Sequence, residues 1–77
     1  MTETKLADGI VSDPEVCGGR PRIAGTRITV ADILSALAAG DTIDELVVDF
    51  PYLSREGIQA ALQYAADNFD HRIVAAA

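Results

Sequence analysis

The chain has 77 residues and a formal net charge of −6 at pH 7, with 12 acidic residues, six basic residues and a single cysteine. Phosphate backbones and anionic lipids repel an acidic surface, which argues against broad electrostatic affinity for nucleic acid or membranes. One cysteine excludes an internal disulfide, and no histidine and cysteine set has zinc spacing, so we expect no metal and no cofactor.

The same features indicate where the protein resides and how it is stabilised. No signal peptide and no apolar run of about twenty residues is present, and the lone thiol favours a cytoplasmic protein without membrane contact. A chain of this length buries roughly 60 to 65% of its unfolded surface, so its core is thin. We therefore expect homodimerisation to supplement that core.

Residues 1–9 are polar and without periodicity, and they predict a loose N-terminal segment. Residues 10–30 then predict a short β-ribbon, because glycines and a proline mark a turn there and polar residues then alternate with β-branched ones. Period-two alternation separates an apolar face from a basic face. The apolar face, which we predict to be the dimer interface, consists of Ile23, Ile28 and Val30.

The rest of the chain is helical in pattern, with helices expected at about 30–39, 43–50 and 55–69. Thr29 and Thr42 each precede an apolar repeat of helical spacing and have an acidic residue three positions later, which predicts capping boxes. Ser54 is the predicted cap of the third helix, and Phe50 is placed in the buried stripe of the second. Residues 10–70 thus form a single predicted domain, followed by a tail at 71–77.

The second and third helices, joined by about four residues, match a helix-turn-helix in outline. In that interpretation four polar side chains would contact DNA, namely Ser54, Arg55, Gln59 and Gln63. An ordinary solvated helix face is the alternative, because acidic residues share the third helix. The expected fold class is mainly α, a three-helix homeodomain-like or helix-turn-helix bundle preceded by a short N-terminal β-ribbon.

A series of short motifs runs in order along residues 10–66. They are Asp13-Pro14, Cys17-Gly18-Gly19, Gly25-Thr26-Arg27-Ile28, Gly40-Asp41-Thr42, Phe50-Pro51-Tyr52-Leu53 and Ala61-Leu62-Gln63-Tyr64-Ala65. This series resembles the bacterial and archaeal family called domain of unknown function 433, or DUF433. The resemblance implies a helix-turn-helix fold preceded by short strands, as in the family.

Many members of that family are thought to be antitoxins paired with a nuclease toxin. The resemblance therefore implies a VapB-like antitoxin that binds and neutralises a PIN-like ribonuclease, and it leaves open repression of the shared operon through operator DNA. The partner-binding residues would be Arg20, Arg22 and Arg27, since an arginine can reach a carboxylate-rich metal site. A stand-alone DNA-binding regulator is the alternative function. We expect no enzyme, because no nucleophile has a plausible base.

Overall fold

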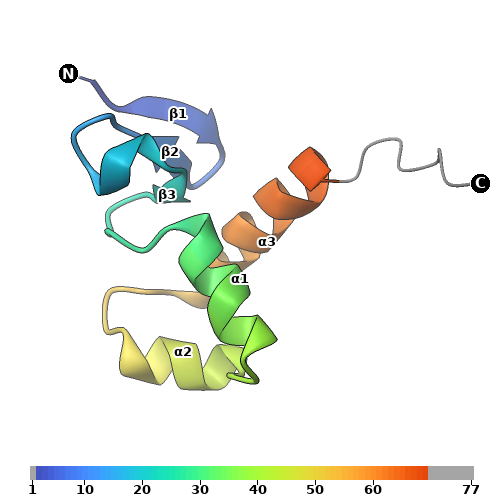
Figure 1. Ribbon diagram of the computed structural model, residues 1–77. Helices are drawn as coiled ribbons and strands as arrows, with labels where there is room; N and C mark the ends of the chain where they lie inside the picture. Colours follow the sequence, from blue (N-terminus) through green and yellow to red (C-terminus); the bar gives the residue numbers. More distant parts are fainter. Residues whose placement is uncertain (1, 70–77) are drawn as a thin grey trace, which may run out of the picture.

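The computed structural model describes residues 2–69, and the predicted tail at 71–77 lies outside this range (Figure 1). Three strands come first, β1 (Thr4–Ala7), β2 (Ile10–Ser12) and β3 (Arg22–Ile23), with the short 3-10 helix η1 (Cys17–Gly19) between the last two. Three helices follow, α1 (Val30–Ala38), α2 (Ile43–Asp49) and α3 (Arg55–Phe69).

The strands form one antiparallel sheet in the order β1-β2-β3, with Lys5 opposite Val11 and Ile10 opposite Ile23. Gly9 lies in the turn between β1 and β2 with a φ of +79°, and an added Cβ would stand 3.1 Å from the Cβ of Ala60. Glycine is favoured there because the turn needs a left-handed backbone pressed against α3. The prediction of a loose N-terminal segment over 1–9 is wrong for 4–7, which pair with β2 as an edge strand.

The predicted fold class is also wrong. The N-terminal ribbon is present, but it is one part of a three-stranded antiparallel sheet that stands beside three helices, so the fold is not a helical bundle. The physical reason is that β1 adds the third strand from an exposed, polar sequence. A strand exposed along most of its length needs no apolar alternation, so the sequence pattern does not mark it.

The helices begin where the sequence predicts. The Thr29 hydroxyl accepts from the Asp32 backbone N–H at 3.0 Å, and the Asp32 carboxylate accepts from the Thr29 N–H at 3.0 Å. Thr42 and Glu45 form the same reciprocal pair, at 3.1 and 2.8 Å. Both capping boxes satisfy backbone donors that a helix terminus would otherwise leave unpaired. They fix where α1 and α2 start.

The core is shared between the sheet and the helices. Its fully buried large side chains come from four elements: Ile10 of β2, Ile33 of α1, Leu46 of α2 and Ile58 of α3. The helix α3 packs against both other helices and against β2 and β3. Close packing on β3 depends on Gly57, where an added Cβ would lie 3.0 Å from Cγ2 of Ile23. The sheet and α1 are therefore held on one central helix (Figure 1).

Candidate functional site

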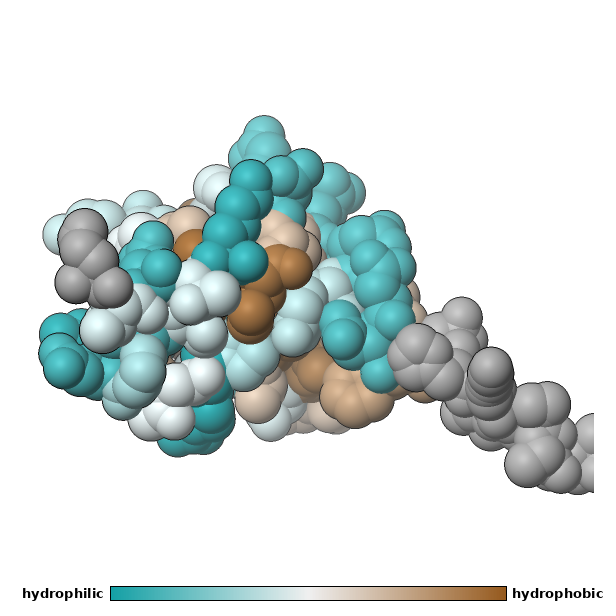
Figure 2. Space-filling model, turned by 90° about the horizontal axis from the view of Figure 1, so that it is seen from above, coloured by the Kyte–Doolittle hydropathy of each residue, from teal (hydrophilic) through white to brown (hydrophobic). Residues whose placement is uncertain are grey.

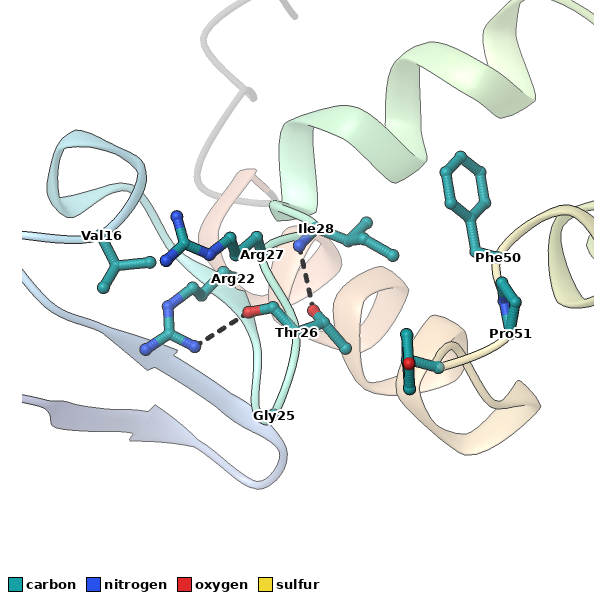
Figure 3. A pocket seen from close by; sticks show the side chains of 9 residues that line it. Val16, Arg22, Gly25, Thr26, Arg27, Ile28, Phe50 and Pro51 are labelled. Atoms are coloured by element: carbon teal, nitrogen blue, oxygen red, sulfur yellow. Dashed lines mark hydrogen bonds between the residues drawn. The ribbon is translucent and has the colours of Figure 1, made fainter.

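A cavity of about 520 Å³ opens between the loop that follows β3 and the connector between α2 and α3. We call it the loop cavity, and its lining is Val16, Arg22, Gly25, Thr26, Arg27, Ile28, Phe50, Pro51 and Tyr52. Arg22 and Arg27 lie at one end, whereas Phe50 and Pro51 lie at the other (Figure 3). The cavity thus joins a basic end to an aromatic end.

The loop after β3 is fixed by its own hydrogen bonds. The Thr26 hydroxyl donates to the Ile23 carbonyl at 2.8 Å. The same hydroxyl accepts from the Ile28 N–H at 3.0 Å (Figure 3). The Ile23 N–H donates to the Ile28 carbonyl at 2.9 Å. The Cys17 thiol donates to the Arg27 carbonyl at 3.4 Å, which ties η1 to the same loop. The short Gly-Thr-Arg motif therefore forms one rigid wall of the cavity.

The three predicted partner-binding arginines have different surroundings. Arg22 is 7% exposed and donates to the Thr26 carbonyl at 3.0 Å and to Glu3 at 3.2 Å. Arg20 is exposed and its Nε donates to the Cys17 carbonyl at 3.2 Å, away from the cavity lining. Arg27 is exposed and lines the cavity. Because internal groups hold the Arg22 guanidinium, its assignment to partner binding is corrected to a structural role.

The predicted dimer interface is also corrected. Ile23 and Val30 are 5% and 6% exposed and belong to this chain's own core, so they have almost no surface for a second chain. Ile28 is half-buried and lines the loop cavity. Period-two alternation identifies apolar positions correctly but cannot say whether the chain itself or a partner covers them. Dimerisation through these three residues therefore loses its basis.

The proposed DNA-contacting residues are engaged with neighbours or stand beside acids. Ser54 accepts from the Gly57 N–H at 3.0 Å as the cap of α3, and Gln63 donates to Asp67 at 2.9 Å. Arg55 is ion-paired with Asp44 of α2. Gln59 is exposed, on a shallow surface of α3 that Glu56 shares. This face presents few free donors to a phosphate backbone.

The aromatic end of the cavity was not found by the sequence interpretation. Phe50, predicted to be buried in the stripe of α2, is 44% exposed, and Tyr52 is 86% exposed. Phe50 follows the last residue of α2, and Pro51 prevents the helix from continuing, so both aromatic rings leave the helical register. Leu53, 3% exposed, anchors the connector to the core. The motif Phe-Pro-Tyr-Leu, with its proline in the middle, was the available signal.

The exposed apolar surface is concentrated near this connector. Val48, Phe50 and Tyr52 are large, exposed and within five positions of one another in the sequence. Seen from the end that carries the sheet, the molecule is mostly hydrophilic with small hydrophobic areas (Figure 2). Among the described residues, the other two exposed large apolar side chains, Leu6 and Phe69, lie on β1 and at the end of α3. The connector is therefore the better candidate for binding.

Neither a metal-binding cluster nor a membrane-spanning helix is found in the part of the chain that the structure describes. Among residues 2–69, no group of three or more histidine, cysteine, aspartate or glutamate side chains is arranged to hold a metal ion. In the same residues, no helix is both long and apolar enough to cross a membrane. The site consists of a rigid loop, an exposed arginine and two exposed aromatic rings, a combination suited to recognition of another molecule.

The fold is a small module of a three-stranded sheet and three helices, and comparisons with known proteins place it in a family. Residues 10–65 match the family model described as "Protein of unknown function (DUF433)". The chain belongs to this family, as the motif series predicts. The matched residues include the whole loop cavity.

Similar proteins of known sequence or structure agree with this placement. The uncharacterised protein y4eO of Sinorhizobium fredii is 36% identical over 59 residues, which cover 77% of this chain and 27% of that protein. The crystal structure of a DUF433 member from Anabaena variabilis superimposes with a TM-score of 0.76 at 35% identity, covering 84% of this chain and 64% of that one. The crystal structure of Rv2018 from Mycobacterium tuberculosis superimposes with a TM-score of 0.67 at 29% sequence identity, covering 79% of this chain and 30% of that one. The chain therefore spans only part of the length of these relatives.

Proposed function

We propose that the protein is an antitoxin-like binding module that docks on a PIN-like ribonuclease and neutralises it. The observation that carries the proposal is the loop cavity, in which the exposed Arg27 stands at one end and the exposed Phe50 and Tyr52 at the other. Arginine, tyrosine and other aromatic residues dominate the energetic centres of protein interfaces. A rigid wall behind them lowers the entropy lost on docking.

The charge of the helical part supports a basic protein partner. Residues 28–54 contain five acidic residues and no lysine or arginine. Such a surface attracts a basic nuclease and accelerates its association, whereas it repels a nucleic-acid backbone. Arg55, the first base after this stretch, is itself paired with Asp44.

The proposed inhibitory contact is made by Arg27. Its side chain makes no hydrogen bond or ion pair within residues 2–69, while its backbone carbonyl is held by Cys17. A guanidinium can bind a carboxylate through two parallel hydrogen bonds, which matches the acidic metal site of a nuclease. Occupying those carboxylates would displace the metal that the nuclease needs.

Affinity capture from the native cell lysate tests the proposal, with nuclease treatment of the lysate as a control against partners bridged by nucleic acid. We expect one small nuclease-like protein to be retained after that treatment, and its purified form to lose RNA cleavage when an equimolar amount of the chain is added. Recovery of DNA-dependent partners alone, or a captured nuclease that stays active, would reject the antitoxin proposal.

A further inference from the structure

A second hollow lies beside the loop cavity, between α1 and α2. This α1–α2 groove has a volume of about 390 Å³. Its lining is Ile28, Asp32, Ile33, Ala36, Asp41, Leu46, Asp49 and Phe50. Ile28 and Phe50 line both hollows, so the groove continues from the aromatic end of the loop cavity.

The groove combines an apolar floor with an acidic rim. Its accessible apolar surface comes from the half-buried Ile28 and Ala36 and the exposed Phe50, while Ile33 and Leu46, each 1% exposed, belong to the core below. The three aspartates are exposed, and Asp32 uses one oxygen to cap α1. The carboxylates of Asp41 and Asp49 make no hydrogen bond or ion pair within the part of the chain that the structure describes. Among residues 2–69, no lysine or arginine lines the groove.

These two features select the chemistry of an occupant. The aliphatic stem of a lysine or arginine covers apolar surface while its charged head stays at the edge, near carboxylates. An anionic ligand is repelled by the rim, and a purely apolar segment would partly desolvate the carboxylates without pairing them. A long cationic side chain can therefore place its stem on the apolar surface of the groove and its charged head beside the carboxylates of the rim.

We infer that the α1–α2 groove is the docking site for a lysine- or arginine-bearing helix of a protein partner. The inference rests on the proposed protein-binding function and names the chemistry of the partner segment. Charge changes sign along the combined surface, from Arg27 to Phe50 in the loop cavity (Figure 3) and on to the aspartates of the groove. This order fixes the direction in which the partner lies, because a reversed segment would place its cations against Arg27.

A peptide experiment tests the groove without any nuclease. The probe is an amphipathic helical peptide with leucines on one face and lysines on the other, and its matched control carries glutamate in place of every lysine. Affinity is measured by fluorescence anisotropy, and the contact surface by amide chemical shifts of the chain. We expect the lysine peptide to bind with the largest shifts at Ala36, Leu46 and Phe50, and the glutamate peptide not to bind.

Two double variants with equal net charge separate the groove from general electrostatics. The double variant Asp41→Asn with Asp49→Asn removes two rim charges and is expected to lower the affinity for the lysine peptide about fivefold to tenfold. Glu56→Gln with Asp67→Asn removes two charges on α3 and is expected to change affinity by less than about twofold. Circular dichroism verifies that both variants fold.

Three outcomes overturn the inference: no binding of the lysine peptide, equal weakening by the two double variants, or equal binding of the glutamate peptide. A partner that proves not to be a nuclease would instead overturn the proposed function while these peptide results stood. The proposed nuclease-binding function and the assignment of the groove can therefore be rejected independently of each other.

Discussion

Arg22 is a charged side chain placed inside the fold. Its guanidinium bonds the Thr26 carbonyl on the loop and Glu3 near the start of the chain, and its Nε has no partner among the described residues. A buried charge is costly unless it is paired, so these contacts constrain the position of the loop relative to β1. The alternating pattern marks Arg22 as polar surface, because the period cannot reveal that Glu3 and the loop cover it.

Truncating Arg22 should weaken the fold. We expect Arg22→Ala to lower the free energy of unfolding by about 1 to 3 kcal/mol, because the Thr26 carbonyl loses its donor and the side chain leaves a void. Both variants remove the unpaired Nε, but Arg22→Met keeps most of the volume and is therefore expected to cost less than Arg22→Ala. Urea unfolding measures both variants. An alanine variant as stable as the wild type would contradict this role.

Asp13 should titrate below its ordinary range. The Glu15 N–H at 2.9 Å, the Thr2 hydroxyl at 2.7 Å and the charge of Arg22 lower the pKa of its carboxyl below the ordinary 3.8, against a smaller opposing effect of burial. A lowered pKa contributes stability that is present above pH 3.8 and is lost as the pH falls through the folded value. NMR titration of the Asp13 carboxyl group measures this pKa. We expect Thr2→Ala to raise the pKa and Thr4→Ala to leave it unchanged; an unchanged pKa in Thr2→Ala would refute the assigned cause.

At the scale of elements, short sequence motifs correctly predicted the helix ends, because neighbouring residues determine where a helix begins and ends. Both capping boxes and the proline after α2 are read directly from neighbouring residues, and the structure confirms them. Strand β1 and the exposure of Phe50 depend on contacts distant in sequence, so periodicity alone could not find them. The same limit explains why Ile23 and Val30 were predicted to contact a second chain. The alternating pattern shows that these side chains must be buried, but it does not show whether this chain or another one buries them.

The cap of α2 offers a direct test at this scale. Thr42→Ala removes the acceptor for the Glu45 N–H, and we expect it to lower the free energy of unfolding by about 1 kcal/mol. Thr42→Ser keeps the hydroxyl and should retain most of that stability. Thermal or urea unfolding compares the two. If serine destabilises as much as alanine, the hydroxyl cap is not the cause.

At the scale of the whole molecule, the surface divides into regions of different character. The end that carries the sheet is mostly hydrophilic (Figure 2), while the connector after α2 exposes Phe50 and Tyr52. Only the chemical content of the candidate site was evident from the sequence, through the Gly-Thr-Arg-Ile and Phe-Pro-Tyr-Leu motifs. Their meeting in one cavity is a tertiary fact, because more than twenty positions separate them.

The central claim is that the loop cavity binds and inhibits a nuclease partner. Its most direct test titrates the captured ribonuclease with the wild-type chain and with Arg27→Ala, Tyr52→Ala and, as a control on the sheet end, Lys5→Ala, while RNA cleavage is followed. We expect the wild type and Lys5→Ala to abolish cleavage at equimolar ratio, and the two cavity variants to need at least about tenfold more protein. Equal inhibition by all four proteins would contradict the assignment of the cavity as the binding site.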